Sequence, residues 1–279
     1  MAVKDVARSF RHSVWLGWKV DANWTDPLLF AIYSVIRPIA GMLIVIFLFL
    51  VGSQVGENTD PNYLSYVFVG NTFFILVAQI MLSMGWVIHE DREHYEVLKC
   101  IYISPASLYV YLLGRAFSTA LMALISVAIS LLFGVAVLQM PIDIFLINYA
   151  ALGLSLIIGL VAISSFGLIL ASVALLTARH GAGMVGEAVA GIFYLFCGVL
   201  FPVSALPPWA QVVSKVLPLT YWMKAVRASM FGVGPAEILN DIAVLAAYTG
   251  VFYIVSLGVL RLADYLARDK GLIDITTEY

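Results

Sequence analysis

Long apolar stretches separated by short polar segments dominate the hydrophobicity pattern of this chain. Six stretches are long enough to cross a lipid bilayer, because a transmembrane helix needs about 20 mostly apolar residues. We place them at about Phe30–Val51, Tyr63–Val87, Tyr109–Leu138, Ile144–Leu175, Met184–Phe201 and Ile238–Leu260. The pattern therefore predicts an all-α, polytopic membrane protein with six transmembrane helices.

The segments outside these stretches divide the chain into three parts. Residues 1–29 carry apolar side chains at helical spacing on one face and charged side chains on the other, which predicts an amphipathic helix lying in the cytoplasmic interface. This helix either only anchors the chain or also docks a cytosolic partner. Residues 30–260 form the transmembrane domain, and residues 261–279 form a cytoplasmic tail.

The positions of Lys and Arg predict the orientation in the bilayer. These residues occur in the N-terminal arm, in the loops after the second and fourth stretches and in the tail, whereas the loops at 52–62 and 139–143 contain none. Cytoplasmic loops carry the excess of Lys and Arg. We therefore expect both termini in the cytoplasm and a multi-pass protein of the cell membrane. The connection before the last span is the exception, with three basic residues on the outside.

Composition agrees with this interpretation and excludes several classes of protein. Hydrophobic residues make up 62% of the 279 residues and charged residues 11%, against about 45–50% and 25% in soluble domains. A disordered chain would instead have low hydrophobicity and a high net charge. The net charge of −2 provides no basic field for nucleic acid. Cys100 and Cys197 are too few for a disulfide framework or a zinc finger.

The densest charge cluster is the segment from His89 to Lys99. A zinc-protease helix needs two histidines four residues apart, whereas His89 and His94 are five apart, so we expect no metal site. Acidic residues at its start and Lys99 farther along instead indicate a short cytoplasmic helix, at about 90–104, with an apolar edge against the membrane. Such a helix is either a contact point for a soluble protein or a solvated loop helix without a partner.

The stretch at about 202–230 is too apolar for a free loop and is interrupted by prolines. Broken backbone at membrane depth persists only where it is packed in protein or lines a cavity. We expect two short helices, about Pro208–Leu217 and Leu219–Met230, that dip into the outer leaflet as a re-entrant segment. The residues assigned to it are Pro202, Pro207, Pro208, Pro218, Thr220 and Tyr221.

Few charged side chains fall inside the predicted spans. Arg37 and Arg115 are long enough to extend to the interface. Glu187 is short and costly in lipid, so it belongs either to a structural ion pair with Arg179 or Arg115 or to a substrate or proton site. Small residues around it would let another helix approach closely, within the subunit or across a dimer. These residues include Gly183, Gly186 and Gly191.

Sequence motifs for catalysis are missing. None of the six lysines precedes Ser or Thr, so no P-loop for ATP is present. There is also no nucleophile elbow and no ladder of titratable residues across a span. We therefore expect no enzyme and no cofactor bound by this chain. If the protein moves a solute uphill, another chain supplies the energy.

The order of these features resembles the permease subunits of type-2 ABC exporters, over nearly the whole chain. Arg92–Lys99, continuing to Ile103-Ser104-Pro105, is similar to the cytoplasmic coupling helix of that family, and Phe201-Pro202, Leu206-Pro207 and Pro218–Tyr221 are similar to its outer re-entrant helices. The resemblance implies that one group of residues couples the chain to an ATPase. The group is Glu90, Asp91, Arg92, Glu93, Glu96, Leu98 and Lys99.

The resemblance also implies the partners. Two permease subunits would pair, as a homodimer or heterodimer, with two cytosolic ABC ATPase subunits that hold ATP and Mg. The transport path would run outward between the two permeases, with the first and fifth spans near the dimer axis. The substrate would be hydrophobic or amphipathic, such as a drug, a lipid or a lipid-linked glycan.

Two other classes of protein stay open: an ion-coupled carrier or channel using Glu187, and an intramembrane enzyme or assembly scaffold.

Overall fold

The structure, a computed structural model, describes residues 3–22, 27–55, 61–104, 106–177, 181–232 and 235–273. These residues form helices and contain no strand, so the predicted all-α class is confirmed. The α-helices are α1 (Val3–Asp21), α2 (Pro27–Val55), α3 (Pro61–His89), α4 (Val97–Ile103), α5 (Leu108–Ala136), α6 (Tyr149–Leu176), α7 (Gly181–Phe196), α8 (Pro208–Val216), α9 (Pro218–Met230) and α10 (Pro235–Asp269). A π-helical turn, η1 (Glu90–His94), and two 3₁₀ turns, η2 (Ile144–Leu146) and η3 (Val203–Ala205), complete the described part.

Five described helices are long and apolar enough to cross a membrane, namely α2, α3, α5, α6 and α10. The predicted fifth span forms the apolar helix α7, which has only 16 residues. At 1.5 Å per residue this helix covers about 24 Å, short of the roughly 30 Å of a hydrocarbon core. The count of six spans therefore stays a prediction.

Two predicted boundaries differ from the structure. The fourth stretch was expected to be helical from Ile144, but α6 begins at Tyr149, because the side chain of Asn148 accepts a hydrogen bond from the amide of Ala151 and caps the helix there. The last helix does not end near Leu260 but continues to Asp269. The first part of the predicted tail is therefore an extension of α10.

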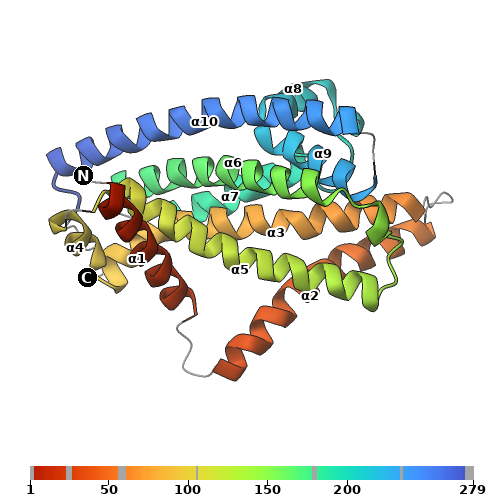
Figure 1. The fold of residues 1–279 in the computed structure, drawn as a ribbon, viewed down its shortest axis with the longest axis horizontal. Coiled ribbons are helices and arrows are strands. Elements are labelled where there is room, and N and C mark those ends of the chain that lie inside the picture. Colours follow the sequence, from red (N-terminus) through yellow and green to blue (C-terminus); the bar gives the residue numbers. More distant parts are fainter. Residues whose placement is uncertain are drawn as a thin grey trace.

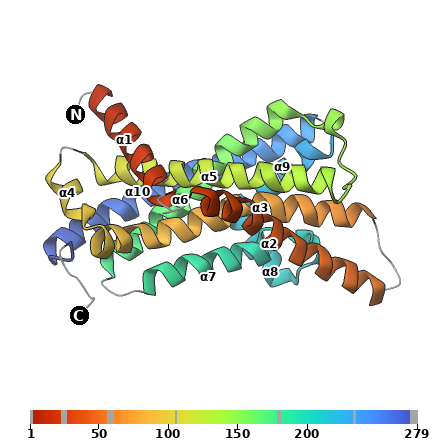
Figure 2. The ribbon, with the colours of Figure 1, turned by 90° about the horizontal axis from the view of Figure 1, so that it is seen from below.

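Helix α3 lies at the centre of the bundle, and α5, α6 and α7 pack around it (Figure 1). Its side chains Leu76, Val77 and Ile80 are completely buried, so it behaves as a core helix rather than a lipid-facing one. Helix α10 runs along α6, and α9 contacts both of them. Figure 2 shows α2 crossing the face formed by α3 and α5.

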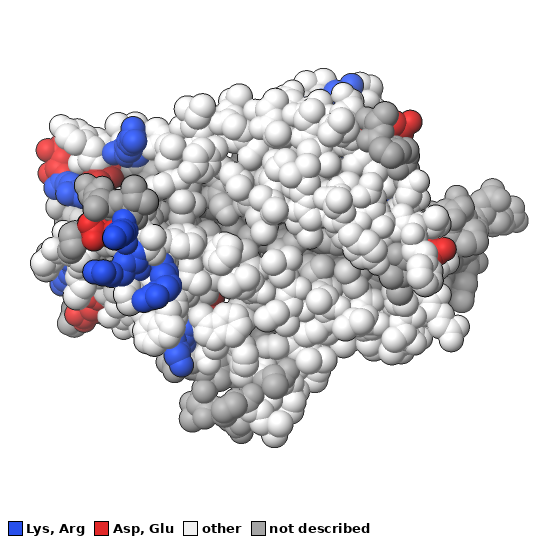
Figure 3. All heavy atoms as spheres, in the orientation of Figure 1, with Lys and Arg blue, Asp and Glu red and all other residues white. Residues whose placement is uncertain are grey.

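The two ends of the bundle differ in charge. Lys and Arg gather at one end, formed by α1, α4 and the C-terminal end of α10, whereas the long sides of the molecule carry almost none on the face shown (Figure 3). We call this the charged end. Helices α8 and α9 lie toward the opposite end (Figure 1). The side chains therefore segregate as expected for a molecule whose middle faces lipid.

The proline-rich segment folds into the two expected helices. Pro208 and Pro218 each occupy the first turn of a helix, where the missing amide hydrogen costs nothing. Pro202 and Pro207 precede η3 and α8 as their N-terminal caps. Thr220 donates a hydrogen bond to the carbonyl of Ser214, 2.7 Å away. These contacts fold the segment back on itself, while its depth in the membrane stays a prediction.

A buried arginine ties this segment to the bundle. Arg227 of α9 donates to the carbonyls of Gly198 and Val199, both at 2.7 Å, and to the carbonyl of Tyr66 at 3.3 Å. Its guanidinium also lies 3.6 Å from the centre of the Tyr66 ring. Gly70 of α3 makes room for it, since a Cβ there would lie 2.0 Å from an Arg227 nitrogen. One side chain thus joins α9, α3 and the turn after α7.

Candidate functional site

The predicted coupling helix is two pieces rather than one helix. Helix α3 continues past His89 into the π turn η1, and α4 begins only at Val97. Between them Glu96 has a left-handed backbone, with φ of 50°. A residue other than glycine costs about 1–2 kcal/mol there. The chain therefore makes a sharp corner at the charged end of α3, and α4 projects from it.

The seven predicted coupling residues separate into a buried group and an exposed group. Asp91, Arg92 and Leu98 are buried, and the side chain of Glu93 is only 3% exposed, 3.6 Å from His89. Glu96 and Lys99 are exposed, and the side chain of Glu90 is partly exposed. A contact surface for another protein at this corner therefore consists of the second group, not of all seven residues.

Two exposed apolar side chains extend this surface and were missed from the sequence. Ile103 of α4 is 86% exposed, and Tyr95 lies exposed at the corner. The apolar edge expected for this helix included neither of them. Their exposure beside Glu96 and Lys99 is typical of a protein contact, in which apolar anchors are surrounded by charges. We call Tyr95, Glu96, Lys99 and Ile103 the α4 surface.

Arg92 connects the corner to α6. Its guanidinium donates to the carbonyl of Leu175 at 3.0 Å and to the carbonyl of Thr177 at 3.2 Å. The last carbonyls of a helix have no partner within it and carry partial negative charge, so a buried cation there is well placed. A movement of η1 would therefore pull directly on the C-terminal end of α6.

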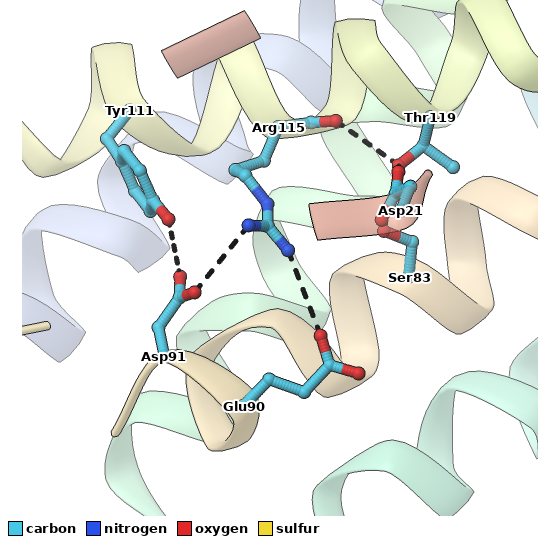
Figure 4. A network of polar contacts seen from close by, with 7 residues as sticks. All are labelled: Asp21, Ser83, Glu90, Asp91, Tyr111, Arg115 and Thr119. Atoms are coloured by element: carbon cyan, nitrogen blue, oxygen red, sulfur yellow. Dashed lines mark hydrogen bonds and ion pairs between the residues drawn. The ribbon is translucent and has the colours of Figure 1, made fainter. Parts of the chain in front are cut away.

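A buried ion-pair network connects the same turn to α5 (Figure 4). The Arg115 guanidinium lies 3.7 Å from a carboxylate oxygen of Asp91 and 3.8 Å from one of Glu90. The hydroxyl of Tyr111 donates to Asp91 at 2.7 Å. Arg115 is only 2% exposed, so the expectation that it extends to the membrane interface is wrong. The two carboxylates of η1 hold it inside the protein instead.

The amphipathic helix α1 joins this network at Thr119, one turn along α5 from Arg115. Thr119 of α5 contacts both Asp21 of α1, at 3.5 Å, and Ser83 of α3, at 2.9 Å (Figure 4). Burial raises the pKa of Asp21, and the Arg115 guanidinium opposes that rise. Close contact supports the link, because a Cβ at Gly114 would lie 2.4 Å from that of Ser13. Helix α1 is therefore packed on the bundle.

A cavity of about 770 Å³ lies between α1, α2, α3, α5 and α7. Its walls combine apolar and aromatic side chains with polar ones, and Arg37 and Glu187 both line it. Glu187 is exposed and, among the described residues, forms no ion pair. The expected pairing with Arg115 is wrong, because η1 engages Arg115; the other expected partner, Arg179, lies outside the described residues. Arg37 lies 5.6 Å from the centre of the Tyr33 ring.

The small residues of α7 serve mainly the subunit itself. A Cβ at Gly183 would lie 2.1 Å from the Trp86 ring, and one at Gly186 would lie 2.6 Å from the carbonyl oxygen of Met81. Both glycines therefore let α7 approach α3 closely, and of the two expected alternatives they serve the contact within the subunit. Gly191 has nothing within 4 Å of its Cβ position and still fits a contact with another chain.

Gly186 and Gly191 give a matched pair of substitutions. Gly186→Ala is expected to lower the melting temperature of the purified protein, because its methyl group meets a backbone oxygen that cannot rotate away. Gly191→Ala is expected to leave it unchanged or raise it, since Ala is better by about 1 kcal/mol in a helix. Thermal unfolding in detergent measures both. Equal melting temperatures would contradict the packing of α7 on α3.

The described residues contain no group of three or more His, Cys, Asp or Glu side chains placed to hold a metal ion. The polar residues of the site instead join helices at the charged end and line one cavity. Together with five helices of membrane-spanning length, this arrangement defines a multi-pass helical membrane protein with a polar contact surface at one end.

Comparison with known proteins gives the family. Residues 9–231 match the family model of the ABC-2 type transporter, and the chain therefore belongs to that family. It is also 31% identical over 180 residues to the "Putative transport permease ycf38" of Cyanophora paradoxa. That match covers 61% of this chain and 57% of the relative, less than two thirds of the relative's length. The resemblance to this family seen in the sequence is therefore confirmed.

Proposed function

We propose that this permease is the membrane subunit of an ATP-driven exporter and is coupled to cytosolic ABC ATPases through the α4 surface. The observation that carries the proposal is the combination of exposed Glu96 and Lys99 with buried Arg92 in the turn η1 just before them. The exposed side chains offer a contact to a soluble protein. The buried one connects that contact to α6.

The network at Arg115 gives the same contact a second route into the bundle. A displacement of α4 moves η1, and η1 holds the end of α6 through Arg92 and the N-terminal part of α5 through Asp91 and Arg115. Ion pairs of this kind have discrete partners, so they favour a switch between two arrangements over gradual deformation. This suits the conversion of ATP binding into a helix movement.

The proposal places the charged end in the cytoplasm, both termini included, and α7 across the cell membrane as the sixth span. The basic residues of α1 and α10 favour this orientation. On α8, exposed Trp209, Val212 and Val216 form an apolar face, which supports its insertion into the outer leaflet as part of a re-entrant segment.

A second copy of the permease completes the transport path in this proposal. Helix α2 exposes apolar side chains such as Ile44, Phe47 and Leu48, and α7 exposes Met184 and Ile192 beside Gly191. The cavity lies between these two helices. A partner covering α2 and α7 would enclose it, and its mixed lining suits a hydrophobic or amphipathic substrate.

Purification of the tagged permease from its native membrane tests the coupling. We expect a P-loop ATPase to accompany it, with ATP and Mg held by that chain. Glu96→Arg is expected to reduce the retained ATPase at least about tenfold, since like-charge contacts cost several kcal/mol at an interface. Glu237→Arg, an exposed glutamate of α10 toward the opposite end, is the control and should retain it. Equal loss in both variants would contradict the proposal.

Cysteine cross-linking tests the dimer. In a Cys100→Ser background, which removes the exposed cysteine, Gly191→Cys is expected to form a disulfide-linked dimer in the membrane. Gly258→Cys on α10, whose Cβ position is equally open, is the control and should stay monomeric. A disulfide-linked dimer formed only by Gly258→Cys would contradict the proposal, because the second copy would then contact α10 and not α7.

The exposure of Glu187 in the cavity favours one alternative function, an ion-coupled carrier. In that case transport in vesicles would follow an imposed proton or sodium gradient without ATP, and Glu187→Gln would abolish it. The exporter proposal predicts ATP-dependent transport that Glu187→Gln alters only in substrate affinity.

A further inference from the structure

We propose that a second pocket, between α4, α5 and α10 at the charged end, binds the phosphate group of an anionic phospholipid. The pocket has a volume of about 490 Å³, within the range of small-molecule sites. It shares no lining residue with the larger cavity. Its occupation requires no ATPase, so the proposal stands apart from the coupling mechanism.

Two arginines of α10 give the pocket its charge. Arg261 is exposed and has no ion-pair partner among the described residues. Arg268 lies across the Tyr102 ring, 4.8 Å from its centre, and pairs with Asp264 at 3.2 Å. The carboxylate of Asp264, the one acidic group in the lining, is thus already neutralised and also accepts from Tyr102 at 2.7 Å. Arg261 remains as an uncompensated cation, the group that binds phosphate most specifically.

The start of α5 adds a second source of positive potential. Ser107 precedes this 29-residue helix, and its side chain forms no capping hydrogen bond. The first amide groups of a helix lack partners and favour an anion. Ser107 and Leu108 line the same pocket as Arg261 and Arg268. The start of α5 and the two arginines therefore border one cavity.

The inner part of the pocket is suited to a lipid rather than a soluble phosphate. Leu257 and Leu260 line it toward the middle of α10, and the hydroxyl groups of Tyr109 and Tyr253 hydrogen-bond to each other there. Neighbouring Ile254 and Leu262 of α10 are exposed and face lipid in a spanning helix. A headgroup at Arg261 would thus continue into acyl chains along α10. Basic pockets between membrane helices bind anionic headgroups in this way.

Native mass spectrometry of the full-length protein tests the site. Purified protein in detergent is titrated with phosphatidylglycerol and, separately, with phosphatidylcholine. We expect one tightly bound phosphatidylglycerol per chain and weaker binding of phosphatidylcholine. Arg261→Gln should weaken phosphatidylglycerol binding about tenfold or more, the loss expected for a hydrogen bond to a charged group. Arg11→Gln, an exposed arginine of α1 at the same end, is the control and should not change it.

Two further measurements test whether the lipid occupies this pocket and whether the site prefers a lipid to free phosphate. Leu257→Trp fills the pocket without changing its charge and should also prevent binding. A large excess of inorganic phosphate should not displace the lipid. Equal binding by wild type and Arg261→Gln would overturn the site, and displacement by inorganic phosphate would overturn its assignment to a lipid.

Discussion

Arg115→Met is expected to lower the free energy of unfolding by about 3–5 kcal/mol, the usual cost of removing one partner of a buried ion pair. Arg115 is 2% exposed and balances the carboxylates of Asp91 and Glu90. Without it, the Asp91 carboxylate would stay buried with Tyr111 as its remaining partner. Urea or thermal unfolding of the purified protein in detergent measures the loss.

A double variant and an exposed pair serve as controls for this prediction. Asp91→Asn in the Arg115→Met background removes the second charge and should recover a large part of the stability, because burying an amide costs much less than burying an unpaired carboxylate. Arg268→Gln breaks an exposed pair with Asp264 and should cost less than about 1 kcal/mol. If Arg115→Met were no more damaging than Arg268→Gln, the buried network would not hold η1 on α5.

Arg227→Met is expected to cost about 3 kcal/mol or more, since hydrogen bonds to charged groups contribute about 1.5–3 kcal/mol each. The substitution leaves the carbonyls of Tyr66, Gly198 and Val199 without this donor in a region with little water. We expect the link between α9 and the turn after α7 to loosen. Limited proteolysis at this turn, together with thermal unfolding, measures both effects.

Lys224→Met is the matched control for this second prediction. It removes a cation from the same helix, α9, but Lys224 is exposed and lies over the Tyr221 ring. The melting temperature of the Lys224→Met variant should stay close to that of the wild type. Equal effects of the two substitutions would show that charge on α9, and not the carbonyl contacts, stabilises the segment.

The helices could be predicted from the sequence because apolar length and prolines report local structure. Pro208 and Pro218 fix the starts of α8 and α9 through their own backbone geometry. The end of α10 could not be predicted from apolarity, because the helix leaves its apolar part and continues with Ala263 and Ala267 against the bundle. The sequence alone does not show whether a small residue such as alanine is buried against a neighbouring helix.

The side-chain partners at the candidate site could not be predicted, because they come from segments far apart in the chain. The charge cluster at 90–99 could be singled out from the sequence as a candidate site, yet its sequence does not reveal that Arg92 caps α6 or that Asp91 meets Arg115. For the same reason Gly183 and Gly186 were open to either a dimer or an intramolecular contact until α3 was placed beside them.

Chemical cross-linking in the native membrane tests the central claim most directly. Lys99 of α4 is exposed at the charged end, whereas Lys215 and Lys224 are exposed on α8 and α9 toward the opposite end. An amine-reactive cross-linker followed by mass spectrometry reports the neighbours of all three lysines in one sample. The account predicts cross-links from Lys99 to a P-loop ATPase and none to it from Lys215 or Lys224. An ATPase linked through Lys215 or Lys224, or no ATPase at Lys99, would contradict it.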